Sequence, residues 1–316
     1  MNAFLTKLKR QLIVSANFFR SQEDQVALER RLRGKDEANK LADADCSIVS
    51  FGKSGRTWLR VMISGFYQAK HGLSESQMVV FDNLHRKNPE IPKLFFTHDN
   101  YLKDATGNSD SKSDYYGKKV IFLARHPGDV AVSQFFQWQH RMRNRKMLIN
   151  DYPSKDDQLS IHDFVVGEKA GLPKIIDFMN LWANESSSIG DFLLIKYEDM
   201  KSEPAQTLRR VLDFIGTPGT DAEIEQAVAY SSFDNMKKME EKRTFWLSGS
   251  RMVPKDRNNP HSFKVRRGKV GGFRDYFDEN EEAAIEKLIN GTLSPFFGYE
   301  SIEAPAVSAE DHTTGQ

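Results

Sequence analysis

Short apolar runs alternate with helix-length segments along this chain. The runs at 47–51, 93–97, 119–124 and 191–195 have the length and the β-branched and aromatic content of buried strands. Helical periodicity follows them, most clearly over 57–70. Strands that alternate with helices predict an α/β fold, a three-layer sandwich around a central parallel sheet. Ligands bind such sheets at the carboxyl ends of the strands.

Charge and cysteine content narrow the classes of function. The net charge of +1 leaves no basic excess for coating nucleic acid, so we expect no nucleic-acid partner. A basic site must then be local, as in a pocket for one polyanionic cofactor. The single cysteine, Cys46, cannot form an intrachain disulfide, which predicts a reducing, cytoplasmic location. Because the histidines are scattered, we expect no metal site.

The chain divides into three predicted segments. Residues 1–42 indicate a helical appendage, 43–300 the main domain, and 301–316 a disordered tail of small and polar residues. The stretch 141–155 is polar and basic, and we expect it to be a mobile excursion.

The first helix has an apolar face formed by Leu5, Leu8 and Leu12. We expect this face to dock on the main domain, with peripheral contact to a membrane surface as the minority alternative. No window of the chain has the length and apolarity of a membrane-spanning helix.

The first motif, Phe-Gly-Lys-Ser-Gly-Arg-Thr-Trp at 51–58, combines a strand end, a glycine-broken loop and a helix start. Such a turn directs backbone N–H groups and the positive end of the helix dipole at one point. Lys53 adds a charge, and Ser54 and Thr57 add hydroxyl donors, so the motif predicts a cradle for phosphate or sulfate. A Walker A loop would need glycine where Ser47 stands, so this loop is too short for that motif.

Four more motifs follow in order along the chain, at 125–133, 197–200, 231–236 and 266–268. The first two come directly after predicted strands. Arginine in the first and last can grip a phosphate with paired hydrogen bonds. Taken singly, each also fits a solvated polar loop.

The ordered set resembles the motifs of the PAPS-dependent sulfotransferase family, where PAPS is 3′-phosphoadenosine 5′-phosphosulfate. Residues 51–58 are similar to the family's 5′-phosphosulfate loop, commonly Tyr-Pro-Lys-Ser-Gly-Thr-Thr-Trp, and 125–133 to its 3′-phosphate segment, commonly Arg-Asn-Pro-Lys-Asp-Val-Ala-Val-Ser. Residues 197–200 match its Tyr-Glu-Asp-Met, and 266–268 resemble its Arg-Lys-Gly. With these matches the chain resembles a bacterial-like variant of the cytosolic-type sulfotransferase domain. The resemblance implies a P-loop nucleotide-hydrolase-like sulfotransferase fold.

The resemblance implies an enzyme of the EC 2.8.2 type. It would transfer a sulfuryl group from PAPS to a hydroxyl or amine of a small-molecule, lipid or carbohydrate acceptor by in-line displacement, releasing PAP without a metal. It assigns the cofactor to Lys53, Ser54, Gly55, Arg56, Thr57, Trp58, Arg125, Ser133, Tyr197, Ser231, Phe233, Arg266, Arg267 and Gly268.

Three residues would carry the chemistry. Lys53 would neutralise the leaving oxygen, and Ser133 would steer Lys53. His98 resembles the histidine of the family's Lys-Thr-His and would be the general base, because a near-neutral imidazole suits proton removal from a hydroxyl.

The chain also departs from the family pattern. Gly52 replaces a proline and Arg56 a threonine. The family's C-terminal dimer signature is not visible, so the oligomeric state stays open.

The sequence leaves the acceptor and two other functions open. An apolar acceptor pocket is one interpretation of the aromatic residues, although each taken singly is more typical of the core; they are Phe81, Phe96, Tyr101, Phe135, Phe136, Trp138 and Trp246. The basic run 141–146 favours an anionic acceptor or a membrane surface, although a solvated face is the commoner explanation. The alternatives are a nucleotide-dependent kinase of the P-loop-like class and a nucleotide-binding scaffold without turnover.

Overall fold

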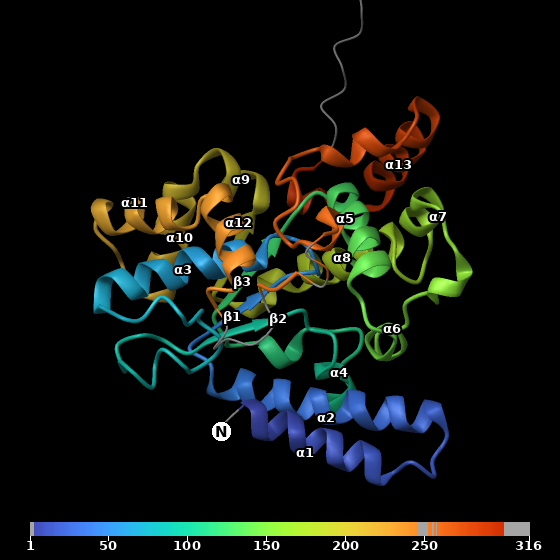
Figure 1. Ribbon diagram of the computed structural model, residues 1–316, viewed down its shortest axis with the longest axis horizontal. Helices are drawn as coiled ribbons and strands as arrows, with labels where there is room; N and C mark the ends of the chain where they lie inside the picture. Colours follow the sequence, from blue (N-terminus) through green and yellow to red (C-terminus); the bar gives the residue numbers. More distant parts are fainter. Residues whose placement is uncertain (1–2, 246–251, 255, 257, 300–316) are drawn as a thin grey trace, which may run out of the picture.

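Four parallel strands form the centre of the molecule in the order β2-β1-β3-β4 (Figure 1). Their bounds lie close to the predicted runs: β1 Cys46–Val49, β2 Leu94–Thr97, β3 Val120–Ala124 and β4 Phe192–Lys196. The structure is a computed structural model that describes residues 3–245, 252–254, 256 and 258–299. The strand order reverses at β1, so the crevice between β1 and β3 is the switch point where such sheets bind ligands.

Helices cover both faces of the sheet, which confirms the predicted three-layer α/β sandwich (Figure 1). Successive strand residues point to opposite faces: Ile48 enters the core under α3, α10 and α11, whereas Val49 enters the core under α5, α8 and α13. Both side chains are fully buried. The covering helices are α3 Arg56–His71, α5 Pro127–His140, α8 Leu172–Ile189, α10 Pro204–Ile215, α11 Asp221–Tyr230 and α13 Glu279–Thr292.

Shorter elements surround the carboxyl edge of the sheet. They are α4 Leu102–Thr106, η1 Ser113–Tyr115, α6 Asn144–Ile149, η2 Lys155–Asp157, α7 Ile161–Val166, α9 Tyr197–Ser202, α12 Phe233–Lys242, η4 Pro260–Ser262, η5 Gly272–Tyr276 and η6 Pro295–Phe297. A short helix, α6, lies within the segment 141–155 that was predicted to be a mobile excursion. Met147 of α6 is buried against Phe135 and Trp138, and this apolar anchor was hidden among basic neighbours.

The N-terminal segment forms two helices side by side, α1 Ala3–Ala16 and α2 Gln22–Asp43 (Figure 1). Helix α2 packs tightly on α4: a Cβ on Gly34 would lie 2.2 Å from the Tyr101 carbonyl oxygen, so only glycine fits there. Arg30 of α2 also forms a two-pronged ion pair with Asp104 of α4, at 2.8 and 2.9 Å. Helix α2 therefore supports the chain that follows β2.

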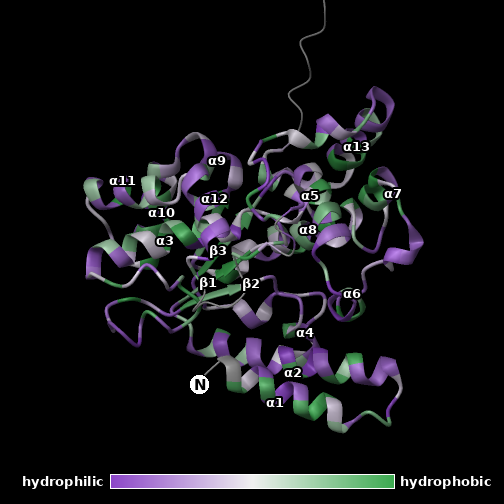
Figure 2. Cartoon of the chain, viewed as in Figure 1, coloured by the Kyte–Doolittle hydropathy of each residue, from purple (hydrophilic) through white to green (hydrophobic). Residues whose placement is uncertain are grey.

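Helix α1 contacts α2 and leaves leucines exposed on its outer side, whereas the apolar residues of the sheet are enclosed (Figure 2). Because Leu5, Leu8 and Leu12 are exposed, the prediction that this face docks on the main domain is wrong. No helix among the described residues is both long and apolar enough to cross a bilayer. The predicted tail, 301–316, lies outside the described residues.

Candidate active site

A cavity of about 480 Å³ lies at the carboxyl edge of the sheet. Every residue assigned to the site from the sequence lines it except Ser54, which is buried under the loop after β1. The lining members are Lys53, Gly55, Arg56, Thr57, Trp58, His98, Arg125, Ser133, Tyr197, Ser231, Phe233, Arg266, Arg267 and Gly268. The sequence thus identified residues that the fold brings together from six separate parts of the chain.

The loop between β1 and α3 has an unusual backbone. Lys53 has φ 78°, in the left-handed region that residues other than glycine rarely adopt. Gly55 follows with φ 95°, and a Cβ there would lie 2.5 Å from Cδ2 of Tyr197, so both conformation and space require glycine. Helix α3 begins directly after this glycine, which presents its free N–H groups at the cavity.

Lys53 is surrounded by other cations. Its pKa is lowered to about 7, first by burial and then by the charges of Arg141, Arg125 and Arg266; Glu240 partly offsets them. Arg125 also donates from Nη1 to the Lys53 carbonyl oxygen at 3.3 Å, so the two motifs meet in space. A cluster of cations that lower one another's affinity for protons is stabilised by a bound polyanion.

Asp129 of α5 joins the second motif to the C-terminal segment. Its carboxylate accepts N–H bonds from Gly271 at 2.9 Å and Phe273 at 3.0 Å, and it pairs with Arg125 at 3.3 Å. The Arg125 guanidinium also lies 4.2 Å from the centre of the Tyr197 ring. These contacts fix Arg125 at the edge of the cavity.

The segment that carries Arg266, Arg267 and Gly268 is held at its other end by Glu240. This fully buried carboxylate of α12 accepts N–H bonds from Lys264 at 2.9 Å and from Val265 at 3.0 Å. Arg266 donates to the Tyr276 hydroxyl at 2.6 Å. The two arginines are therefore carried on a segment anchored on both sides.

His98 follows β2 and makes a contact with each ring nitrogen. Its Nδ1 lies 2.7 Å from the Ser50 carbonyl oxygen, which can only accept, so Nδ1 carries the proton. Its Nε2 then accepts a hydrogen bond from Nη2 of Arg56 at 2.6 Å. Burial, followed by the Arg56 charge, holds the pKa of His98 well below its usual value. The imidazole is thus neutral, with its basic nitrogen on the Arg56 side.

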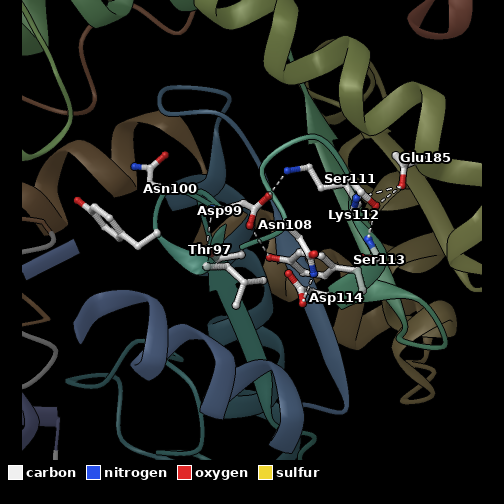
Figure 3. A network of polar contacts seen from close by, with 12 residues as sticks. Thr97, Asp99, Asn100, Asn108, Ser111, Lys112, Ser113, Asp114 and Glu185 are labelled. Carbon is white, nitrogen blue, oxygen red and sulfur yellow. Dashed lines mark hydrogen bonds and ion pairs between the residues drawn. The ribbon is translucent and has the colours of Figure 1, made fainter. Parts of the chain in front are cut away.

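A buried ion pair fixes the backbone beside His98 (Figure 3). Asp99, at φ 52°, accepts hydrogen bonds from Lys112 Nζ at 2.7 Å and from the Tyr115 hydroxyl at 3.0 Å. Its own N–H donates to Oγ1 of Thr97 at 2.8 Å. Sequence reasoning missed this network, because Lys112 lies in a polar loop with no signal that it pairs with Asp99.

Helix α2 contacts the same loop through Glu37. This carboxylate lies 3.2 Å from the Tyr101 N–H and 3.3 Å from Oγ1 of Thr97. Burial and the neighbouring Asp99 charge raise the pKa of Glu37 to about 7. The N-terminal helices therefore help to hold the His98 loop.

The described aromatic candidates for an acceptor pocket lie outside the cavity lining. Phe135 and Trp138 pack in a small core instead, and none of the other described candidates, Phe81, Phe96, Tyr101 and Phe136, lines the cavity. Trp246 lies outside the described residues. Polar side chains line the cavity together with apolar ones such as Phe51 and Val132; the polar ones include Asn100, Gln134, Lys146, Asn150 and Tyr152. Within the described parts of the chain, no three His, Cys, Asp or Glu side chains are grouped to hold a metal ion.

A family model described as "Sulfotransferase domain" matches residues 43–297. The chain belongs to the sulfotransferase family. Two relatives of this sulfotransferase are plant enzymes: cytosolic sulfotransferase 7 of Arabidopsis thaliana, 26% identical with 78% of each chain covered, and flavonol 3-sulfotransferase of Flaveria bidentis, 24% identical with 85% of this chain and 88% of that one covered.

Solved sulfotransferase structures share the fold. A mouse sulfotransferase complexed with PAP has a TM-score of 0.52 and 19% identity over 82% of this chain and 89% of that one. Retinol dehydratase in complex with androsterone and the inactive cofactor PAP has a TM-score of 0.54 and 18% identity over 86% and 87%. The parallel sheet of this sulfotransferase thus belongs to the P-loop-like α/β type.

Proposed function

We propose that this sulfotransferase transfers a sulfuryl group from PAPS to a hydroxyl or amine of a small-molecule, lipid or carbohydrate acceptor and releases PAP. One observation carries the proposal: Lys53, Arg125 and the Arg266–Arg267 segment line one cavity together with His98. The solved neighbours bind PAP, which supports the choice of donor.

The residues fit a nucleotide with phosphates at both ends. The loop after β1 would bind the 5′-phosphate through the N–H groups of Gly55, Arg56 and Thr57, and Lys53 would bind the oxygen that leaves sulfur. Arg125, Ser133, Arg266, Arg267 and Gly268 would bind the 3′-phosphate. Trp58 and Phe233 would enclose the adenine, and Tyr197 and Ser231 would contact the adenosine. The lowered pKa of Lys53 supports this assignment, because an anion would relieve the repulsion among these cations.

His98 would act as the general base. PAPS, when bound, supplies the sulfuryl group. The acceptor O–H loses its proton to Nε2 of His98 while its oxygen bonds to sulfur, and the S–O bond to the 5′-phosphate breaks. Lys53 stabilises the electron pair left on that oxygen. Positioning and fixed charge provide most of the acceleration in transfers of this type.

A thermal-shift comparison tests the donor assignment. PAP at a hundred times its dissociation constant should stabilise the protein by about 2.7 kcal/mol without a metal. Stabilisation by ATP and magnesium alone would favour the kinase. Stabilisation by PAP with no transfer from radiolabelled PAPS to an acceptor panel would favour the scaffold.

We also propose a cytoplasmic location. Cys46 is a buried thiol whose pKa is raised to about 12 by burial, as expected of a packed side chain without a disulfide. The Arabidopsis thaliana relative is named as cytosolic.

A further inference from the structure

The cavity has two groups of cations. Lys53 lies with Arg125 and Arg266, the group assigned to the donor nucleotide. A second group lies beside His98 and consists of Arg56 and Lys146, which both line the cavity. Besides burial, the charges of Arg56, Lys146 and Arg60 lower the pKa of His98, so this second group acts on the imidazole.

The second group exceeds what the donor requires. Lys146 lies on α6 and is an exposed residue that also lines the cavity; desolvation and then the cations Arg56, Arg33 and Arg141 lower its pKa. Asp129 is the single carboxylate among the described residues that line the cavity, and it is already held by Arg125 and two backbone N–H groups. The described lining therefore offers no second carboxylate beside His98.

The surroundings of this group are polar. Asn100 and Asn150 line the cavity there, and they join each other through a hydrogen bond of 3.3 Å between Nδ2 and Oδ1. Gln134 is buried, and its Oε1 has no hydrogen-bond partner among the described residues. Amide groups with two nearby cations suit a charged, hydrogen-bonding molecule better than an apolar one.

Arg56 also occupies the atom that the reaction needs. Its bond to Nε2 of His98 uses the lone pair that would take the acceptor's proton. A guanidinium forms a stronger hydrogen bond with an anion than with a neutral imidazole. An anion beside His98 would therefore draw Arg56 away and leave Nε2 open to the acceptor hydroxyl.

Resting on the function proposed above, we propose that the acceptor carries an anionic group, which Arg56 and Lys146 bind beside His98. Binding of this group releases Nε2 of His98, so an acidic acceptor is both selected and activated. Arg56 acts here as a positioning residue, and Lys146 determines specificity. The proposal names an acidic hydroxyl compound as the acceptor class.

Calorimetry on the PAP-loaded protein tests this with matched probes. One pair is 4-hydroxyphenylacetate and 4-hydroxyphenylacetamide; the other is 4-hydroxybenzenesulfonate and 4-hydroxybenzenesulfonamide. The acid should bind at least about tenfold more tightly than its amide in one or both pairs, as expected for charge-assisted hydrogen bonds. The pair with the larger ratio of acid to amide affinity shows whether the site prefers a carboxylate or a sulfonate-like group.

Variants connect the preference to the two residues. Lys146→Met and Arg56→Thr should each bring the ratio of acid to amide affinity close to one, whereas Lys146→Arg should keep the wild-type ratio. Arg143→Met is the matched control, because Arg143 is an exposed cation of the same basic run that does not line the cavity. It should keep the wild-type ratio.

The imidazole ¹⁵N spectrum gives a second readout. In the wild type, acid but not amide should shift the Nε2 signal of His98, and Arg56→Thr should abolish that difference. Amides that bind as tightly as acids, probes that do not bind at all, or a ratio unchanged in Lys146→Met would overturn the proposal. PAP binding is measured first. If the protein does not bind PAP, the proposed function itself is wrong.

Discussion

The two ends of the cavity are built in different ways. At the donor end, cations on the loop after β1, at Arg125 and at Arg266 crowd together, and the pKa of Lys53 is lowered to about 7. At the base end, His98 is already bonded at both ring nitrogens, and Asp99 beside it is paired with Lys112. Under the proposed function the nucleotide would complete the donor end, whereas the protein itself holds the base end.

This difference separates two kinds of damage. Substitutions at the base end should change turnover or folding and leave nucleotide binding intact. Substitutions at the donor end should change nucleotide affinity. Four experiments follow, beginning with the largest expected effect.

Removing the base should separate the ends most clearly. His98→Ala should lose about 10²–10⁴-fold in turnover, the range for a general base, while its affinity for PAP stays as in the wild type. Single-turnover assays with radiolabelled PAPS and thermal shift with PAP measure the two quantities. His162→Ala on α7 is the control, because His162 does not line the cavity. Unchanged turnover in His98→Ala would reject the role.

Breaking the buried ion pair tests whether the base end is held by the fold. Lys112→Met leaves Asp99 as an unpaired buried charge, which should cost about 3–5 kcal/mol in urea unfolding. In the protein that remains folded, turnover should fall while PAP affinity stays. Lys103→Met removes an exposed lysine of α4 and should change stability by less than about 0.5 kcal/mol. Equal stability of both variants would show that the pair is dispensable.

At the donor end, Arg125→Met should weaken PAP binding by about 10- to 100-fold, as expected for loss of a charged hydrogen-bond donor. The PAP affinity of Arg125→Lys should lie between those of the wild type and Arg125→Met, because lysine keeps the charge and loses the two-pronged geometry. Calorimetry measures both. Arg274 pairs with Glu286 and does not line the cavity, so Arg274→Met should bind PAP normally. A normal affinity in Arg125→Met would place the 3′-phosphate elsewhere.

The smallest effect is a pH dependence of PAP binding. The free protein has the pKa of Lys53 at about 7, and a bound anion favours the protonated form. Below pH 7 the lysine is already charged; above it, binding must take up a proton, so affinity should fall by up to about tenfold per pH unit. Titrations from pH 7.5 to 9, where the phosphates are already ionised, should show proton uptake that is lost in Lys53→Met. A flat profile in the wild type would contradict the crowded-cation description.

The sequence predicted the donor end better than the base end. The loop after β1 and the segment at Arg125 are continuous, and glycine and cations at strand ends have a direct meaning there. His98 was found from its place after β2, but its contacts were not. Asp99 and Lys112 are brought together by a loop, and no spacing rule encodes such a pair.

The acceptor side shows the same limit. Aromatic residues of α5 were candidates for an acceptor pocket as well as for the core, and Phe135 and Trp138 pack in a core beneath α6. Met147 belongs to that core, although its basic neighbours predicted a mobile excursion. Burial of a few apolar side chains outweighed the local composition.

The left-handed backbone at Lys53 has a consequence for engineering. A side chain at this φ costs about 1–2 kcal/mol relative to glycine, and the lysine is also repelled by its neighbours. A screen for heat resistance alone would therefore select Lys53→Gly and recover well-folded protein that has lost its reactivity. Thermostable variants of this chain must be sought with turnover as a second criterion.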